Sequence, residues 1–482
     1  MQSLSHYRTT DDTKMDPEKG DTGDVRTGLE TVVDQERPED QPVVHDAVFG
    51  NQGDGAVQYR SVGVFSTSIL MSKVQLGLGI LALPSSFHTL GLVPGLIIYF
   101  FFVLVTGWCG IVAGDFKRRH PSVYSISDCF EVMFGPWGGE FAGVAYLLYS
   151  TFSCGSALLT ISTALNAISL HATCTAVFVV AGAVVTWPVA SVSTLKDIRW
   201  FGWAGLSSII VAVIVATIAI GVEDRPSTAP QIGPWDKGMV IFGTPHFTNA
   251  MNAVANIFFC LSGPTVFVAI ASEMRNPQDY NKALMMSQGM VSTVYLVIAL
   301  VVYCYAGQYV ASPALGTAGV LVKRISYGLA LPGLLFTAAL FCHIPAKWIF
   351  VRALRNSRHL SEKTRTHWLV WLSCTAGCHL FAYIVASAIP VFSGLVGLIS
   401  SLFSSILCLH AMALMWLYDY YPIWKQKRTP LLTLGVVANV LLFIVASFLC
   451  VAGTYGSIVS IKDDYAALGG RPWSCADNSN SS

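Results

Sequence analysis

Two short segments combine residues that cannot continue an ordinary helix in lipid. The first is Gly77-Leu78-Gly79, inside an apolar run that ends at Pro84. The second is Ser262-Gly263-Pro264, in the middle of another apolar run. Backbone groups freed by such an interruption are tolerated in a bilayer only where protein or a cavity satisfies them. We therefore expect both segments to unwind beside a binding site.

The backbone dipoles of two such breaks would suit a zwitterion. A half-helix that begins after Gly79 presents unpaired N–H groups to a carboxylate, and carbonyl groups released before Pro264 suit an ammonium group. Breaks in the first and sixth of a series of spans are what a five-plus-five inverted repeat predicts, with the substrate held where the half-helices meet. Glycine and proline that serve only packing are the alternative for either break alone.

Two ionisable side chains are candidates for ion coupling. Lys73 lies four residues before Gly77 on the same helix face, and it is the only Lys or Arg deep in the first span. An ionisable residue inside a membrane helix is costly enough to be a functional hypothesis by default. His343, in the eighth span, carries an imidazole that titrates near physiological pH. A snorkelling lysine and a hydrogen-bonded structural histidine are the alternatives.

Aromatic and acidic residues near the breaks could complete the site. Tyr149 of the third span could offer its hydroxyl to a carboxylate, and Phe259 could line a pocket for the substrate side chain. Simple packing is the alternative for both. Glu140 lies at the start of the third span and Glu273 ends the sixth, so we expect loop ion pairs or gate contacts from them.

The composition requires a bilayer around these residues. The chain is 53% hydrophobic and only 12% charged, with a mean hydropathy of +0.57. A hydrocarbon core of about 30 Å needs roughly 20 apolar residues per crossing. Eleven segments qualify, which predicts an all-α polytopic membrane protein. They are residues 62–88, 91–114, 139–168, 174–193, 199–221, 251–273, 283–310, 327–351, 368–390, 392–417 and 432–458.

The segments outside the spans differ in charge. Residues 1–60 hold 13 of the 28 acidic and 6 of the 29 basic residues and no apolar run, so we expect a disordered tail. The membrane body is assigned to residues 61–458, and residues 459–482 form a short second tail. The net charge of +1 is thus the sum of an acidic tail and a basic body, and it gives no indication of nucleic-acid binding.

Loop charges predict the orientation. With the amino terminus in the cytoplasm, the inner loops collect 15 Lys and Arg residues and the outer side six, although Lys323 and Arg324 fall on the outer side. The carboxyl terminus is then outside. The plasma membrane is the favoured location, with a vacuolar membrane as the alternative.

The 12 cysteines are scattered singly, mostly inside apolar runs, and do not form a disulfide framework. Cys174 and Cys475 would both lie outside, which leaves one disulfide open. Cys374 and Cys378 would share a helix face, but we interpret them as small packing residues. No metal ligand set or cofactor motif is expected.

Several motifs together resemble a known family. They are Lys73-Val-Gln-Leu-Gly-Leu-Gly-Ile-Leu-Ala-Leu-Pro84, His88-Thr-Leu-Gly-Leu-Val-Pro94, Asn256-Ile-Phe-Phe259, Ser272-Glu-Met-Arg-Asn-Pro277 and Pro345-Ala-Lys-Trp-Ile-Phe-Val-Arg352. Over roughly residues 60–458 the chain resembles the amino acid/auxin permease family of the amino acid–polyamine–organocation superfamily, most of all its fungal neutral amino-acid permeases. The resemblance implies the leucine-transporter-type fold, alternating access, and amino-acid symport with protons or sodium.

The resemblance also bears on the coupling ion. In the sodium-coupled branch of the family the position of Lys73 is an asparagine that helps bind the ion, whereas the proton-coupled animal branch has lysine. A fixed ammonium group would replace sodium there. We therefore expect proton coupling or sodium independence, with neutral aliphatic or aromatic amino acids as substrates.

Other function classes fit less well. The sequence has no HExxH, GxSxG or P-loop pattern, which argues against an enzyme. A channel would need a ring-forming repeat or a dense polar pore segment. The serious alternative is a carrier of the same fold for a polyamine, an auxin-like acid or a pathway metabolite. A polyamine carrier should place carboxylates within spans one, three, six or eight, and none lies there outside the span ends.

Overall fold

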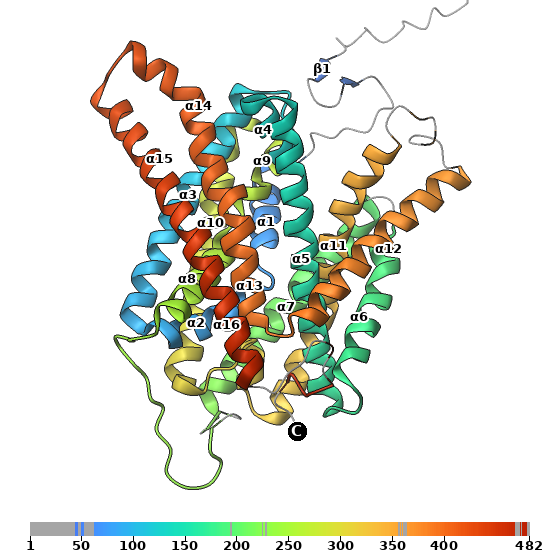
Figure 1. Ribbon diagram of the computed structural model, residues 1–482, viewed down its shortest axis with the longest axis vertical. Helices are drawn as coiled ribbons and strands as arrows, with labels where there is room; N and C mark the ends of the chain where they lie inside the picture. Colours follow the sequence, from blue (N-terminus) through green and yellow to red (C-terminus); the bar gives the residue numbers. More distant parts are fainter. Residues whose placement is uncertain are drawn as a thin grey trace, which may run out of the picture. The chain divides into compact units, whose positions relative to one another are not determined.

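The computed structural model describes residues 44–46, 50–52, 62–192, 195–223, 225–226, 229–354, 357, 359, 364–467, 473 and 475–479. The predicted disordered tail, residues 1–60, lies outside the described residues except for two strands, β1 (Val44–Asp46) and β2 (Gly50–Gln52), which pair with each other. All other long elements in the described part of the chain are helical (Figure 1).

The helices follow one another from residue 64 to residue 467. In chain order they are α1 (Val64–Gln75), α2 (Gly79–Leu90), α3 (Leu92–Arg119), α4 (Ile126–Phe134), α5 (Pro136–Ser169), α6 (Thr175–Ala190), α7 (Leu195–Val222), α8 (Phe247–Leu261), α9 (Pro264–Ser272), α10 (Tyr280–Ala306), α11 (Val320–Ala353), α12 (Arg365–Ala388), α13 (Phe392–Leu398), α14 (Ala411–Gln426), α15 (Pro430–Phe448) and α16 (Thr454–Ala467). Two π-helical segments, Ile399–His410 and Leu449–Gly453, join α13 to α14 and α15 to α16.

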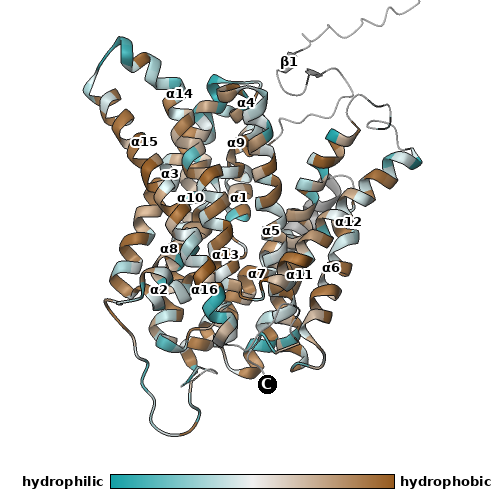
Figure 2. Cartoon of the chain, in the orientation of Figure 1, coloured by the Kyte–Doolittle hydropathy of each residue, from teal (hydrophilic) through white to brown (hydrophobic). Residues whose placement is uncertain are grey.

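The described residues contain nine helices that are long and apolar enough to cross a membrane. One bent pair, α1 with α2, and the shorter apolar helix α6 add to these. Each of the eleven predicted segments overlaps one of these elements. Figure 2 shows hydrophilic residues gathered toward the helix ends, with mainly hydrophobic stretches between them. The prediction of an all-α polytopic membrane protein is confirmed.

Packing between the helices repeats with an offset of five spans. The first span (α1 and α2) packs on α10, the seventh, just as the sixth (α8 and α9) packs on α3, the second. Likewise α5 contacts α12 as α11 contacts α6, and α7 contacts α10 as α14 contacts α3. Since each crossing reverses the chain direction, spans five apart run in opposite directions. The fold is therefore a five-plus-five inverted repeat with an additional eleventh span.

The last helix continues beyond its predicted end at residue 458, as far as Ala467. Its final turns remain packed: Ile461 lies against Gly394 of α13, and Ser457 Oγ donates a hydrogen bond to Asn252 Oδ1 at 3.0 Å. Hydropathy marks the end of an apolar run, whereas the helix persists through charged residues as long as one face is covered.

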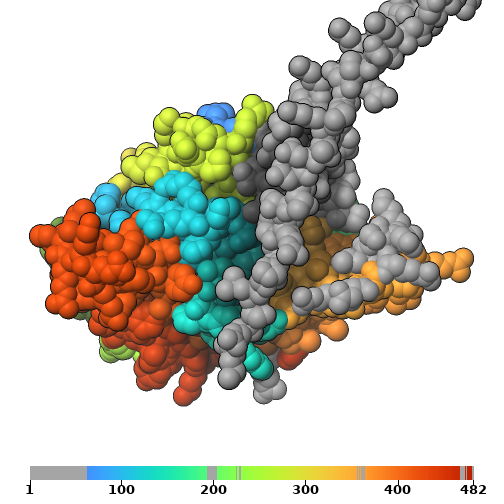
Figure 3. All heavy atoms as spheres, turned by 90° about the horizontal axis from the view of Figure 1, so that it is seen from above, coloured from blue at the N-terminus to red at the C-terminus, as the bar shows by residue number. Residues whose placement is uncertain are grey.

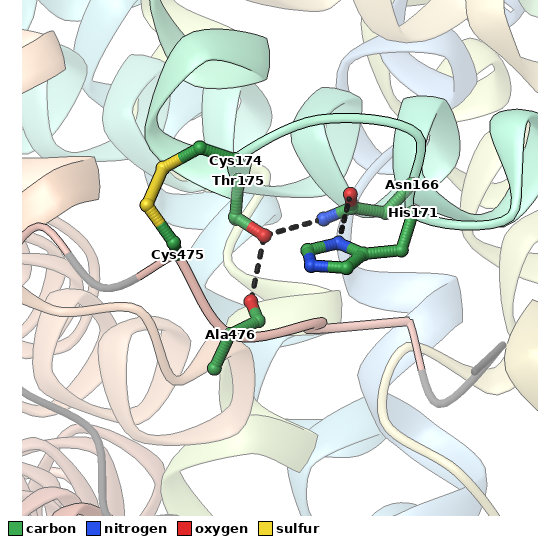
Figure 4. The surroundings of a disulfide bond; sticks show 6 residues. All are labelled: Asn166, His171, Cys174, Thr175, Cys475 and Ala476. Atoms are coloured by element: carbon green, nitrogen blue, oxygen red, sulfur yellow. Dashed lines mark hydrogen bonds between the residues drawn. A yellow bond between two sulfur atoms is a disulfide. The ribbon is translucent and has the colours of Figure 1, made fainter.

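The carboxyl-terminal segment, residues 475–479, is fastened to the end of the bundle where α6 begins (Figure 4). Cys475 forms a disulfide with Cys174, and Thr175 Oγ1 donates a hydrogen bond to Ala476 O at 2.6 Å. On α11, Lys323 Nζ donates to Ser479 O at 3.3 Å. The one disulfide that the sequence left open, between residues 301 positions apart, is therefore present in the structure. The other ten cysteines are free thiols.

Candidate functional site

The first break separates α1 from α2 by residues 76–78 and bends the span by 56°. At the end of α1, Tyr295 of α10 donates its hydroxyl to Gln75 O at 2.5 Å. Gly77 is half-exposed, and a Cβ built on it would meet nothing within 4 Å. Leu78, by contrast, is buried. The interrupted backbone thus has open space beside Gly77.

The second break is narrower than the sequence predicts. Only Ser262 and Gly263 lie between α8 and α9, and Pro264 is the first residue of α9. The expectation that Pro264 unwinds is corrected, because the fixed φ and missing N–H of proline suit the first helical turn. The Ser262 backbone N–H and hydroxyl both donate to Phe259 O, at 3.3 and 2.9 Å.

The two breaks meet at two glycines. A Cβ on Gly79 would lie 2.9 Å from the Cα of Cys260, and Cys260 Sγ donates to Gly79 O at 3.1 Å. A Cβ on Gly263 would lie 2.6 Å from the side chain of Gln75. Only glycine allows these approaches. The predicted meeting of the half-helices is therefore present in the structure.

Polar side chains without partners lie at this meeting point. Both amide atoms of Gln75 are buried and have no hydrogen-bond partner among the described residues, and the same holds for Asn256 Oδ1 on α8. Buried polar groups in proteins are almost always paired. These groups are therefore available to a polar ligand. Gln75 is not among the site residues predicted from the sequence, although a lone amide beside a glycine break in an apolar span is a signal that could have identified it.

The predicted aromatic residues lie around the second break. The hydroxyl of Tyr149, on α5, lies beside the hydroxyls of Ser262 and Ser404, and the Ser404 hydroxyl has no hydrogen-bond partner among the described residues. Ser404 belongs to the π-helical segment Ile399–His410, and such segments often mark functional sites. Phe259 is 9% exposed, near the end of α8. The structure thus brings Tyr149 and Phe259 to the break, and it adds Ser404, a residue that no periodic pattern in the sequence marks.

Lys73 lies one turn before the first break and is half-buried. Its ammonium group stands 4.8 Å from the centroid of the Phe336 ring on α11. No carboxylate among the described residues forms an ion pair with it. A cation–π contact contributes about 0.5–2 kcal/mol, against about 2.5–3.5 kcal/mol for a charge at the centre of a membrane helix. The ring alone therefore does not offset the cost of this charge.

His343 is placed elsewhere. Its ring is 1% exposed, with Nδ1 3.0 Å from Ala190 O at the end of α6. The ring also meets Trp371 of α12 edge to face, with centroids 5.2 Å apart. These contacts lie with α6 and α12, and no described contact joins His343 to either break.

The end of the bundle where α1 begins is closed by polar contacts. Val62 pairs with the backbone of Glu273 and Arg275, and Tyr124 donates its hydroxyl to Glu273 Oε1 at 3.3 Å. Burial raises the pKa of the Glu273 carboxyl, while the Tyr124 hydrogen bond and the charge of Lys347 oppose that shift.

Two further features occupy the same end. Helix α4 lies between the end of α9 and α14 (Figure 3). Glu140 pairs with Arg352, which ties α5 to α11. The predicted loop ion pairs and gate contacts of Glu140 and Glu273 correspond to these interactions.

Known proteins that are similar to this chain include amino-acid transporters. The family described as "Transmembrane amino acid transporter protein" matches residues 60–459. A "Transmembrane transporter" of Fusarium pseudograminearum is 32% identical over 435 residues, covering 90% of each chain. The "N amino acid transport system protein" of Neurospora crassa is 28% identical over 436 residues, 88% of this chain and 90% of the relative.

Two further matches are more distant in sequence. The "Amino acid transporter AVT3A" of Arabidopsis thaliana is 22% identical over 404 residues, 80% of this chain and 87% of the relative. Among solved structures, MhsT in complex with L-phenylalanine matches with a TM-score of 0.46 at 14% identity, over 86% of this chain and 100% of that one. With a family match that spans the whole membrane body, the chain belongs to the transmembrane amino acid transporter family.

Proposed function

We propose that this transporter is a secondary carrier that imports neutral amino acids by alternating access, coupled to protons. The observation that supports it best is the meeting of the two helix breaks at Gly79 and Gly263, where the Gln75 amide lies against Gly263 without a hydrogen-bond partner among the described residues. The name of the Neurospora crassa relative supports an amino-acid substrate.

The backbone at this point offers both poles that an amino acid needs. The first turn of α2 presents N–H groups that suit a carboxylate. Because Pro264 has no N–H, the carbonyl of Cys260 loses the donor that a continuous helix would supply, and it can face an ammonium group instead. Tyr149, through its hydroxyl beside Ser262, adds a donor for the carboxylate.

The absence of acidic side chains favours a neutral substrate. Helices α1, α2, α8, α9 and α11 contain no Asp or Glu, and α5 has only Glu140, which pairs with Arg352 at the helix start. A polyamine or a cationic side chain would therefore lack a carboxylate partner in these spans. A neutral amino acid is therefore favoured over the alternative polyamine cargo.

Lys73 is the proposed coupling group. Its ammonium group pairs with no carboxylate among the described residues and lies one turn from the break, so loss and gain of its proton can be linked to substrate occupancy. His343 remains a second proposed coupling residue, acting from the α6 side of α11.

We propose an amino terminus in the cytoplasm and a location in the plasma membrane. The disulfide supports this orientation, since disulfides persist on the oxidising side of a membrane and Cys174–Cys475 lies at the end opposite the Val62–Glu273 pairing. A vacuolar membrane would give the same sidedness.

Uptake by reconstituted protein tests the central proposal. Purified full-length chain in proteoliposomes should accumulate a labelled neutral amino acid when the outside is acidic, and dissipation of the proton gradient should abolish accumulation. Protein-free liposomes are the control. The proposal is wrong if none of a panel of aliphatic, aromatic, acidic and basic amino acids enters under an inward proton gradient.

The coupling assignment has a separate test. Replacement of Lys73→Asn should flatten the pH dependence of uptake, because the titrating ammonium is gone, while Lys282→Asn changes an exposed lysine and should leave the profile as in the wild type. Initial rates measured over a pH series, with and without sodium, give the answer. An unchanged pH profile in Lys73→Asn would rule out this role and leave the transport proposal intact.

A further inference from the structure

Three potential metal ligands from three helices converge inside the bundle. They are the Sγ atoms of Cys154 on α5 and Cys342 on α11 and a ring nitrogen of His379 on α12, all within 4.8 Å of one another. Cys154 and Cys342 are fully buried, and His379 is 4% exposed. None of the three belongs to the site at the helix breaks.

His379 is oriented as a metal-binding histidine would be. Its Nδ1 lies 3.0 Å from Thr375 O, so this nitrogen carries the proton. The Nε2 atom is buried and has no hydrogen-bond partner among the described residues. A ligating histidine typically donates its other N–H to such a carbonyl, which fixes the tautomer and leaves the free lone pair for the metal.

A third thiol adjoins the cluster. Cys378, the residue before His379 on α12, is 4% exposed, and its thiol lies near that of Cys342. Cys378 also lines a cavity of about 470 Å³ between α5, α11 and α12. This cavity reaches the wall of the cluster and offers an approach to it.

We propose that Cys154, Cys342 and His379 bind a thiophilic d10 cation, Zn²⁺ or Cu⁺, with Cys378 within reach as a fourth ligand. Thiolate and imidazole are the ligands such ions prefer over carboxylates. With Zn–S bonds of about 2.3 Å, tetrahedral sulfur atoms lie roughly 3.8 Å apart, so the ligands need to approach only modestly.

Charge balance favours Zn²⁺ within this class. Binding replaces the two thiol protons of Cys154 and Cys342, which leave to solvent, and the two thiolates cancel the charge of the ion. Packing of small apolar thiols, the ordinary role of buried cysteine, accounts for the sulfur atoms but not for the unpartnered nitrogen of His379. The ion would join α5, α11 and α12.

Metal content of the purified full-length chain tests this inference. After incubation with Zn²⁺, or with Cu⁺ under reducing conditions, and removal of the excess, elemental analysis should find about one ion per wild-type chain. Cys342→Ser and His379→Gln should each lower this at least tenfold. Cys374→Ser is the matched control, because this thiol lines the same cavity outside the three-ligand group, and it should keep the ion.

A spectroscopic readout makes the result independent of transport. Co²⁺ in place of Zn²⁺ should give a thiolate-to-metal charge-transfer band in the wild type and in Cys374→Ser, and none in Cys342→Ser. If Cys342→Ser does not give a monodisperse protein, Cys154→Ala and His379→Gln provide the same comparison. Equal metal content in the wild type and the ligand variants, which surface binding would give, overturns the proposal.

Discussion

Gln75 combines two properties that rarely occur together in a folded chain. It lies at 6% exposure, and both polar atoms of its amide lack partners in the described part of the protein. An unsatisfied buried group costs about 1–3 kcal/mol. Its amide packs against Gly263, and its own carbonyl is held by Tyr295. An unsatisfied polar group that its neighbours hold in position is typical of a site that is completed by a ligand.

Replacement of Gln75→Leu should therefore separate stability from transport. The two side chains are similar in size, so removal of the unpaired amide should leave the free energy of unfolding unchanged or raise it by up to about 1–3 kcal/mol. The melting temperature should accordingly stay the same or rise. Uptake should lose affinity, seen as a KM at least tenfold higher. Gln308→Leu, in the loop after α10, is the control. A lower melting temperature with an unchanged KM would show that the amide is structural.

The sequence predicted the residues whose signal is backbone chemistry. Gly77, Gly79 and Gly263 were found because glycine and proline interrupt helices wherever they occur. Gln75 and Ser404 were missed, since a single polar residue in an apolar span gives no periodic pattern. His343 was selected by chemistry alone, and only the packing of α6 and α12 shows where its ring points.

At the scale of elements, spans were predicted well and their ends less well. Each of the eleven predicted segments overlaps a long apolar helix, the bent pair of α1 and α2, or the shorter helix α6, because apolar runs of this length have few other uses. Hydropathy predicts that the last span ends at residue 458, whereas α16 extends to Ala467 because it packs against α8 and α13. The same limit applies to the narrow second break, where only the structure shows that Pro264 begins a helix.

The strand-like pairing of Val62 with the segment after α9 joins the two broken spans at one end of the bundle. Glu273 lies within this pairing and is partly buried beside Tyr124. Its pKa is raised by that burial, so the folded chain holds this proton more tightly than the unfolded chain does. This contribution to stability is complete below the carboxyl's ordinary pKa and is lost as the pH rises through the raised pKa.

The pairing thus predicts a pH-dependent difference between wild type and Glu273→Gln. The wild type should gain stability relative to the variant as the pH falls through the raised pKa toward 4.5, the ordinary carboxyl value. Thermal unfolding of detergent-purified protein over a pH series measures this. Glu140→Gln, at the exposed ion pair with Arg352, is a control that should not show the same slope. Parallel curves for wild type and Glu273→Gln would contradict the shift.

At the scale of the whole molecule, the carboxyl-terminal segment ties helices together that are far apart in sequence. Besides the disulfide, Asn478 Nδ2 donates to Ser162 Oγ of α5 at 3.0 Å, and the Trp473 N–H donates to Ser387 O of α12 at 3.1 Å. Lys323, which charge counting had placed on the unfavoured side, holds Ser479 there. Its position is explained by this contact.

Loss of the disulfide should therefore destabilise the bundle as a whole. Cys475→Ser should lower the free energy of unfolding by about 3–5 kcal/mol, since the bond closes a long loop of the unfolded chain. The melting temperature of Cys475→Ser should be lower than that of the oxidised wild type. The double variant with Cys174→Ser and Cys475→Ser should have the same melting temperature as Cys475→Ser alone. Cys450→Ser, at a free thiol of the last span, is the control. An equal melting temperature in the wild type and Cys475→Ser would show that the segment is only peripheral.

The position of the disulfide also determines the stage of membrane insertion at which the bond can form. Cys174 leaves the ribosome after three spans. Its partner, Cys475, lies 301 positions later in the chain and eight residues after the end of the last helix. The bond can form only once every later span has been inserted and the final segment has crossed the membrane. Oxidation of this one pair therefore records complete biogenesis, and a mobility shift on a non-reducing gel would distinguish mature chains from those arrested during insertion.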